Sequence, residues 1–367
     1  MLQFKRLNKK LLLEYANSQH FGKGTDIPIS FHRAISQSLN PRLNSTDILL
    51  ILAIGEGRLV GYTGILPDKL FDKTGKSNRF GWLSCLWVSP TARNKGIGKG
   101  LIEEAVKAWD GRILSSDYAP ETKGLYDASG AFLTTPFELE GLRLYIKSDL
   151  QNILPPKHQR WVKLKPALKA IDFLANMIAD LRIPFISNAI SELNVEFVDG
   201  IDDEATAFIA KHNQSELFRR SERELNWILS NPWVISSPKK DAINAKYFFS
   251  STAKVFEYHV VKLSDSKKVL KSVLILSRRE GTLKIPYFFY DGDLDDVLKL
   301  IKHVLLKWKI RTLTIFHKGL KDHVLKSRTP ALFKKKVHRR YMIGGKLESE
   351  FNVDYNIQDG DGDSCFT

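Results

Sequence analysis

The stretch 79-RFGWLSCLWVSPTARNKGIGKGLIEEAVKAW-109 holds three kinds of segment in succession. Its first part is an apolar run that stops at Pro90, and because proline has no N–H to donate to a sheet, the run predicts a strand ending there. Its last part places Leu101, Ala105 and Trp109 on one helical face, which predicts an amphipathic helix. The loop between the two is rich in glycine and in basic residues.

This loop has the composition of a phosphate site, because glycines let the backbone approach closely and the first N–H groups of a helix attract anions. Spacing excludes two nucleotide motifs. A P-loop requires G-x-x-x-x-G-K-[ST], which "GIGKGL" does not supply, and a dinucleotide fingerprint requires a glycine where Leu101 stands. A different phosphorylated ligand and a solvated basic turn both remain open at this point.

The sequence around the loop alternates strand and helix patterns. Residues 2–8 predict a strand and residues 9–21 a helix, and two apolar runs flanking "GEGR" at residues 55–58 predict a hairpin. The strand of the opening stretch would complete a three-strand meander. A strand, a helix and a closing strand are predicted after the amphipathic helix, over residues 111–118, 120–130 and 142–148.

The second half repeats this order of patterns without repeating the residues. A basic lead and a helix with an apolar stripe, between Pro155 and Pro184, are typical of a connector. No glycine loop follows residue 190, and the matching strand "LKIPYFFYDGDLDD" runs into acidic residues, which repel phosphate. We therefore expect a domain over residues 1–150, a helical connector over 151–190 and a second domain over 191–367.

The composition limits which binding partners and which cellular compartment are expected. The 56 Lys and Arg residues against 41 Asp and Glu residues leave a formal net charge of +15, which fits an anionic partner. Cys85 and Cys365 are too few for a disulfide framework or a four-ligand zinc site, so a cytoplasmic location is expected. No apolar run approaches the roughly 20 residues that span a bilayer, and the N-terminal apolar core is too short for a secretory signal.

The pattern V-x-P-x-x-R-x-x-G-x-G, read from Val88, Pro90, Arg93, Gly96 and Gly98, resembles the acyl-CoA motif of the GNAT acetyltransferase superfamily. The resemblance implies an α/β (α+β) fold with a mixed, mostly antiparallel sheet flanked by helices, here in two tandem copies. It also implies an N-acetyltransferase that moves an acetyl group from acetyl-CoA to a primary amine, with no metal expected.

The resemblance extends to individual residues. Backbone N–H groups of the motif strand would meet the acyl carbonyl and pantetheine arm, and the main chain from Asn94 to Lys99 would hold the pyrophosphate. Basic side chains at Arg93, Lys95 and Lys99 add positive charge. The full set implied for acetyl-CoA is Leu86, Trp87, Val88, Arg93, Asn94, Lys95, Gly96, Ile97, Gly98 and Lys99.

The catalytic groups follow less directly. Tyr126 stands where relatives keep a general acid for the thiolate, near Gly130 and Phe132, with Ala131 inserted in the usual pattern. The motif strand has no carboxylate, so Asp117 is the nearest candidate for a general base. Capping the turn that follows is an equal role for Asp117, and a water-relayed base or an already neutral amine would also serve.

Acceptor specificity in the family comes from the region after the first helix. Here His32, Arg33 and Arg42 are the candidate contacts. Because histidine titrates near neutral pH, His32 is also a candidate general base. The acceptor itself stays open among an amino sugar, a peptide terminus and a small amine. Solvated loop residues are the simple alternative for all three side chains.

Other features carry competing interpretations. The tail "QDGDGDSCFT" sets Asp359, Asp361 and Asp363 at alternate positions like the start of a calcium loop, but it lacks the distal glutamate, so docking against basic surface is preferred over metal. The basic amphipathic stretch 157–182 suggests peripheral contact with a membrane or a polyanion. A transferase of aminoacyl groups onto cell-wall precursors is a third possibility, although its donor would not need a pyrophosphate cradle; nucleic acid is not an expected partner.

Overall fold

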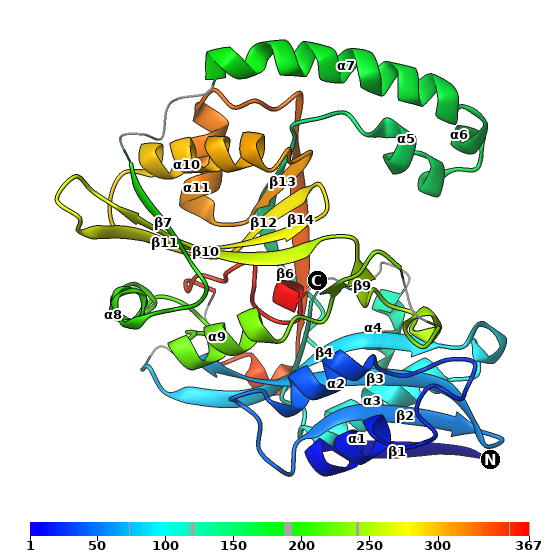
Figure 1. Cartoon of the computed structure of the whole chain (residues 1–367). Coiled ribbons are helices and arrows are strands. Elements are labelled where there is room, and N and C mark those ends of the chain that lie inside the picture. The colour runs from blue at the N-terminus through cyan, green and yellow to red at the C-terminus, as the bar shows by residue number, and fades with distance from the viewer. Residues whose placement is uncertain are drawn as a thin grey trace. The chain divides into compact units, whose positions relative to one another are not determined.

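A computed structural model describes residues 1–72, 74–116, 118, 122–186, 193–239, 242–351 and 353–366 (Figure 1). The chain forms two compact units that interleave along the sequence. Unit 1 comprises residues 1–139, 200–256 and 339–367, and unit 2 comprises residues 140–199 and 257–338.

Unit 1 is built on a mostly antiparallel sheet in the order β1-β2-β3-β4-β5-β14, in which only β4 and β5 run parallel. Its strands are β1 (Leu2–Asn8), β2 (Ile48–Gly55), β3 (Arg58–Phe71), β4 (Ser77–Val88), β5 (Ile113–Ser116) and the C-terminal part of β14 (Phe333–Ile343). Its helices are α1 (Lys9–Ala16), α2 (Phe31–Ser38), α3 (Ile97–Ala108), α4 (Lys123–Ser129), α8 (Asp203–His212) and α9 (Glu222–Ser230), and β8 (Ile235–Ser236) pairs with β9 (Thr252–Ala253) in a separate two-stranded sheet.

The two faces of this sheet are covered by different helices. Because side chains alternate along a strand, Ile51 of β2 packs with Leu101 of α3, whereas its neighbour Leu50 packs with Leu12 of α1. The predicted apolar face of the helix after the glycine loop is therefore the face that α3 buries. This arrangement holds the start of α3 against the end of β4.

Unit 2 has the same order of strands. Its sheet runs β7-β10-β11-β12-β13-β6, and again one pair, β12 with β13, is parallel. The strands are β7 (Asn194–Val198), β10 (Phe256–Ser264), β11 (Leu270–Arg279), β12 (Thr282–Tyr290), β13 (Thr312–Ile315) and β6 (Phe137–Tyr145). The helices are α5 (Leu150–Ile153), α6 (Arg160–Lys163), α7 (Lys165–Ile186), α10 (Leu294–Lys307) and α11 (Lys318–Lys326). The expected fold, a mixed, mostly antiparallel α/β architecture in two copies, is confirmed.

The last strand of each sheet comes from the other half of the sequence. β14 closes the sheet of unit 1 by pairing Tyr341 with Ser116, and β6 closes the sheet of unit 2 by pairing Tyr145 with Thr312. The compact units therefore differ from the predicted segments 1–150, 151–190 and 191–367. Strand pairing between distant segments has no signature in a linear pattern, and this is why those boundaries fall elsewhere.

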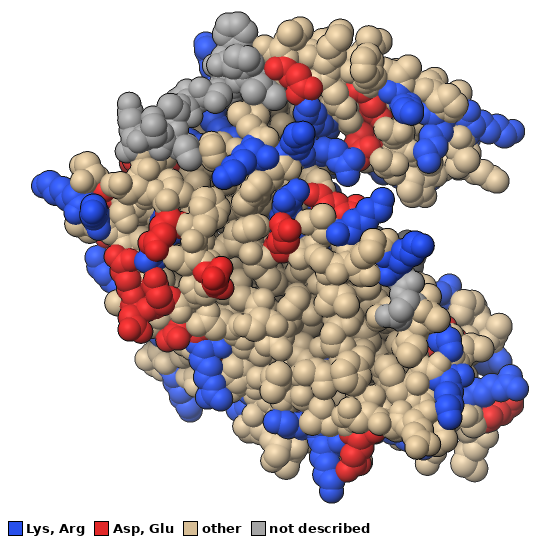
Figure 2. Space-filling view, viewed as in Figure 1, with Lys and Arg blue, Asp and Glu red and all other residues tan. Residues whose placement is uncertain are grey.

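Charges of both signs are interspersed on the face of the molecule seen in Figure 2. The net charge of +15 is therefore not gathered there as a single basic surface. None of the helices in the described ranges is long and apolar enough to cross a membrane.

Candidate functional site

The decisive local feature of β4 is a bulge. Gly64 of β3 pairs with Ser84, but Tyr62 pairs with Trp87, so Cys85 and Leu86 both stand opposite one residue. Cys85 has φ 57°, a left-handed conformation that costs energy for a residue with a side chain. The bulge re-aims the end of β4, as bulges near functional sites commonly do.

The parallel pair of β4 and β5 ends at the same place. Its register runs only from Gly81 with Ile113 to Leu83 with Ser115. Ser84 and Ser116 come next on the two strands, and neither is part of the paired register. The pairing of the two strands therefore ends before Ser84, and the strands separate there.

Two residues of the glycine loop have a left-handed backbone conformation. Asn94 and Gly96 have φ values of 62° and 75°, and Gly96 is the N-cap of α3, whose first turn carries no acidic residue. A Cβ on Gly98 would lie 3.1 Å from Leu125, whereas a Cβ on Gly100 would lie 2.5 Å from the ring of Phe4. Gly98 thus keeps the loop accessible, and Gly100 lets α3 pack against β1.

A cavity of about 590 Å³ lies over this loop in unit 1. Every residue predicted for acetyl-CoA lines it except Lys95 and Lys99; Lys99 lies beside Glu103, 3.7 Å away. The lining is Leu86, Trp87, Val88, Ala92, Arg93, Asn94, Gly96, Ile97, Gly98, Thr122, Leu125 and Phe248. Phe248 and Thr122 are two lining residues that the sequence pattern did not indicate.

Tyr126 of α4 lies next to the point where the strands separate. Its hydroxyl lies 3.1 Å from Ser115 Oγ, and its ring packs edge-on against Phe132 and at a tilt against Tyr118. Burial raises the pKa of the Tyr126 phenol, so the group stays protonated; the residue itself is buried beside the cavity and does not line it. Asp117, the candidate base, lies outside the described residues.

Arg33 is buried at the end of β4 rather than exposed in a loop. Its guanidinium donates to Tyr247 Oη at 2.6 Å and to Ser84 Oγ at 3.0 Å, and it stacks over the ring of Trp233 at 3.9 Å. It also contacts Cys85 Sγ. Arg33 therefore stabilises the bulge through its contacts with Ser84 and Cys85. Its partner Tyr247 is a residue of the site that the sequence pattern did not indicate.

The other two candidate acceptor contacts have partners within unit 1. His32 Nε2 lies 2.7 Å from the carbonyl oxygen of Trp233. Arg42 is 5% exposed and pairs with Asp68 at 2.6 Å and with Glu224 at 3.0 Å. The solvated-loop alternative does not apply to Arg42, and its guanidinium serves the packing of unit 1 instead of facing a ligand.

The acidic tail is ordered, and its three aspartates have separate partners. Asp359 pairs with Arg339 at 2.7 Å and Asp361 with Arg220 at 3.2 Å. Asp363 instead accepts from Ser84 Oγ at 2.7 Å. Docking of the tail against basic residues is confirmed for the first two aspartates.

The buried carboxyl groups around the tail have pKa values far from their ordinary ones. Burial alone would raise the pKa of Asp68, but Arg220 and Arg42 lower it to about 2. Burial raises the pKa of Asp361 to about 6, partly offset by Arg220. Burial and the charge of Asp361 raise the pKa of Glu216 to about 8. Among the described residues, no cluster of His, Cys, Asp or Glu could hold a metal ion.

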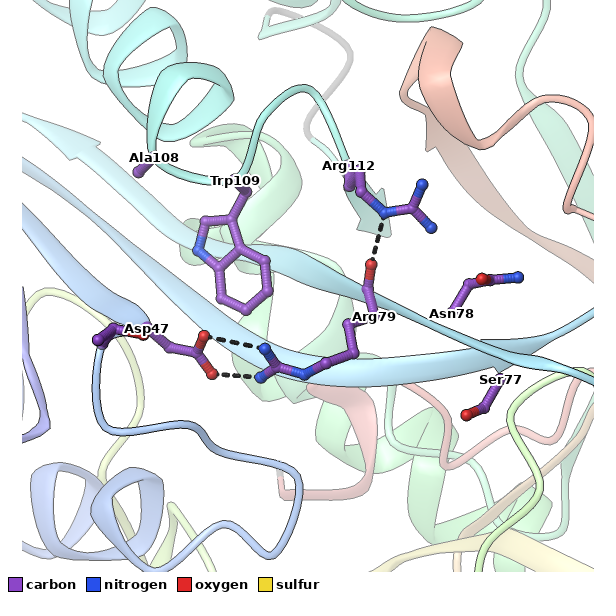
Figure 3. Close-up of a pocket in the computed structure, with 8 residues that line it drawn as sticks. Asp47, Ser77, Asn78, Arg79, Ala108, Trp109 and Arg112 are labelled. Atoms are coloured by element: carbon purple, nitrogen blue, oxygen red, sulfur yellow. Dashed lines mark hydrogen bonds and ion pairs between the residues drawn. The ribbon is translucent and has the colours of Figure 1, made fainter.

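A second pocket of about 400 Å³ lies at the opposite end of β4 (Figure 3). Arg79 there points toward Asp47, with which it forms a two-point ion pair, and Arg112 donates to the carbonyl oxygen of Arg79. Arg112 also pairs with Glu350. Because the arginines of this pocket are already neutralised by carboxylates, the cavity over the glycine loop is the better candidate for an anionic ligand.

Part of the chain matches a known protein family in sequence. Residues 17–114 match the family model of the Acetyltransferase (GNAT) family. No curated protein matches the sequence. Among solved structures, a GCN5-related N-acetyltransferase from Anabaena variabilis is 12% identical with a TM-score of 0.50, over 93% of this chain and 72% of that one.

Two further structures cover nearly the whole chain. A tandem GNAT protein from the clavulanic acid biosynthesis pathway is 13% identical with a TM-score of 0.50, over 93% of this chain and 98% of its own. The Saccharomyces cerevisiae N-myristoyltransferase with bound myristoyl-CoA is 10% identical with a TM-score of 0.52, over 99% and 88%. At these identities the likeness concerns the fold, and it spans both units.

Proposed function

We propose that the chain is an acetyltransferase of the GNAT type, because residues 17–114 match the model of that family, and that it transfers an acetyl group from acetyl-CoA to a primary amine. The observation that carries the proposal is the cavity over the glycine loop, because its lining joins the β4 bulge to the N-terminus of α3. A helix N-terminus with glycine-shaped backbone stabilises a pyrophosphate, and the bulge presents main chain to an acyl group.

The residues of the site have distinct roles in this reaction. The main chain from Asn94 to Gly98 binds the pyrophosphate, and Arg93 adds a charge-assisted contact. Tyr126 donates a proton to the leaving thiolate. Because a thiol with a pKa near 8.5 is already a fair leaving group, we expect this donation to contribute about 10²-fold.

Thermal unfolding tests the binding step. Acetyl-CoA at 100 times its dissociation constant should stabilise the folded chain by about 2.7 kcal/mol, which corresponds to roughly 3–4 °C in Tm for a chain of this length. The increment should grow with the logarithm of ligand concentration. An unchanged Tm at millimolar acetyl-CoA would contradict the proposal, and an Arg93→Glu variant with a reduced shift would support the position of the site.

Turnover is measured by release of free thiol from acetyl-CoA in the presence of a panel of primary amines. The panel should include amino sugars, peptides with free N-termini and small amines, since the side chains near β4 do not select among them. Aminoacyl transfer onto cell-wall precursors is disfavoured, because such a donor has no use for a CoA pyrophosphate cradle.

A second candidate function, peripheral membrane contact, is favoured by the exposed apolar face of α7 in unit 2. Phe173 and Leu181 are 69% and 67% exposed. Of the two acids on this helix, Asp172 is buried and accepts from the backbone N–H of Leu150 at 2.8 Å, and the exposed Asp180 is paired with Lys147. Further exposed apolar residues on α7 are Ile171, Leu174, Met177 and Ile178.

Basic residues surround the start of this helix, and Figure 2 shows largely uncharged surface along α7 with Lys and Arg near its α6 end. They are Lys157, Arg160, Lys163, Lys165 and Lys169. An apolar stripe next to a basic cluster suits the surface of an anionic bilayer. The chain should therefore co-sediment with phosphatidylserine-containing vesicles, and Phe173→Glu should abolish this; a stable dimer without vesicle binding would point to a second copy instead.

A further inference from the structure

The carboxylate of Asp363 lies where β4 and β5 separate. Ser84 Oγ donates to its Oδ2 at 2.7 Å, and Ser116 Oγ donates to its Oδ1 at 3.4 Å. These two serines directly follow the last paired residues of the two strands. The carboxylate therefore bridges the ends of the two strands. Its partner Ser84 stands two residues before Leu86, which lines the cavity, whereas Asp363 lies behind that lining.

The tail that carries Asp363 is anchored on both sides. Before it, the buried Arg220 binds Asp361 and also binds Asp68 through two contacts of 2.8 and 2.7 Å. After it, the ring of Phe366 stacks on Trp233 at 4.5 Å with an interplanar angle of 7°. With these anchors, the position of Asp363 is set by the fold rather than by the freedom of a chain end.

Asp363 differs chemically from the other two acids of the tail. Asp359 and Asp361 are buried and paired with arginines, which neutralise them. Asp363 is half-buried and is held by hydroxyl groups, which orient the carboxylate, and the Arg33 guanidinium interacts with it electrostatically. Of the three aspartates, Asp363 is the one with the partial exposure that a proton acceptor needs.

Resting on the proposed acetyl transfer, we infer that Asp363 is the general base, so that the C-terminal tail supplies a catalytic residue to the site of unit 1. The amine nitrogen forms a bond to the thioester carbonyl carbon, and the carbon–sulfur bond breaks. The proton lost by the nitrogen goes to Asp363, and the sulfur takes a proton from Tyr126. Exchange with water then returns the proton from Asp363 and restores that of Tyr126.

Ser84 is a positioning residue in this arrangement. Arg33 donates to Ser84 Oγ at 3.0 Å, which directs the serine hydroxyl hydrogen toward Asp363. The buried guanidinium thereby fixes the orientation of the base through one intervening hydroxyl. A negative carboxylate at this place also favours acceptors that arrive as ammonium ions, which Asp363 can both attract and deprotonate.

The test is the Asp363→Asn variant of the full chain, assayed by thiol release with the most active amine of the panel. We expect kcat/KM to fall by 10²–10³-fold, with the loss shrinking at high pH, where the amine is neutral without help. The asparagine oxygen can still accept from Ser84, so Tm and the acetyl-CoA-induced shift in Tm should stay close to those of the parent.

Three comparisons complete the experiment. Asp354→Asn, an exposed change in the same tail, should leave the rate unchanged, and Ser84→Ala should lower kcat/KM less than Asp363→Asn does. Formate should partly restore Asp363→Ala. Parent-like kcat/KM at all pH values in Asp363→Asn would overturn the assignment while leaving the proposed function intact. A parent chain without an acetyl-CoA shift, or without turnover of any amine, would overturn both.

Discussion

At the scale of single residues, the three glycines of the opening stretch do different work. Gly96 adopts φ 75° at the N-cap of α3, Gly98 leaves room beside Leu125, and Gly100 meets the ring of Phe4. Only the first two serve the cavity. Both glycines of the motif that resembles an acyl-CoA site therefore serve the cavity, whereas Gly100, which lies outside that motif, serves the packing of α3.

Replacing Gly98 by tryptophan tests this division. A Cβ at position 98 already approaches Leu125 to 3.1 Å, so an indole would fill the cavity over the loop. We expect the acetyl-CoA-induced shift in Tm to disappear. Lys107→Trp, on an exposed position later in α3, should retain the full shift. A parent-like shift in Gly98→Trp would mean that the ligand does not use this loop.

At the scale of elements, the C-terminal tail is the piece that assembles the site. It carries Asp361 into a buried network with Arg220 and Asp68, and it places Gln358 Nε2 3.1 Å from Glu216 Oε1. Glu216 is therefore a buried carboxyl group that faces a buried aspartate. Such a group is more stable protonated, which links docking of the tail to pH.

This linkage predicts a fall in stability as pH rises. The pKa of Glu216 is about 8 in the folded chain, above the ordinary 4.5, so the folded state binds more protons than the unfolded state between these values. The free energy of unfolding should therefore decrease between roughly pH 4.5 and 8, by an amount on the order of a few kcal/mol.

The Glu216→Gln variant isolates this contribution. Glutamine keeps the hydrogen bond to Gln358 without the charge, so Tm should rise above that of the parent at pH 8.5 and match it at pH 5. Urea unfolding at the two pH values gives the free energies directly. Equal pH dependence in parent and variant would show that Glu216 ionises freely in the folded chain.

At the scale of the whole molecule, the two sheets have the same strand order but differ in the segment that follows the fourth strand. In unit 1 the loop after β4 is basic and rich in glycine. In unit 2, α10 after β12 is capped by Asp293 and has Asp295 and Asp296 in its first turn. Acidic groups at a helix N-terminus satisfy the helix themselves and repel a phosphate.

We therefore predict one acetyl-CoA per chain. Isothermal titration of the full chain should give a stoichiometry near one, and the Arg93→Glu variant should weaken the single site by about tenfold or more at low salt. A stoichiometry of two would show that unit 2 binds the ligand in spite of its acidic loop.

The sequence was sufficient where a feature depends on neighbouring residues. Proline at position 90, the glycines at 96 and 98 and the apolar face of α3 all lie within one short stretch, and the backbone conformation each imposes is local. For this reason the strand, the loop, the helix and most of the cavity lining could be predicted. The two copies of the fold were also foreseeable from the order of local patterns.

Only the tertiary structure decided the rest. Ser84 and Asp363 are 279 positions apart, and Arg42, for which a solvated loop position was the simple alternative, forms a buried ion pair with Asp68. The exchange of β6 and β14 between the two sheets is likewise a choice of pairing partner. Such contacts depend on burial and on how distant segments pack, and no local period or motif in the chain records them.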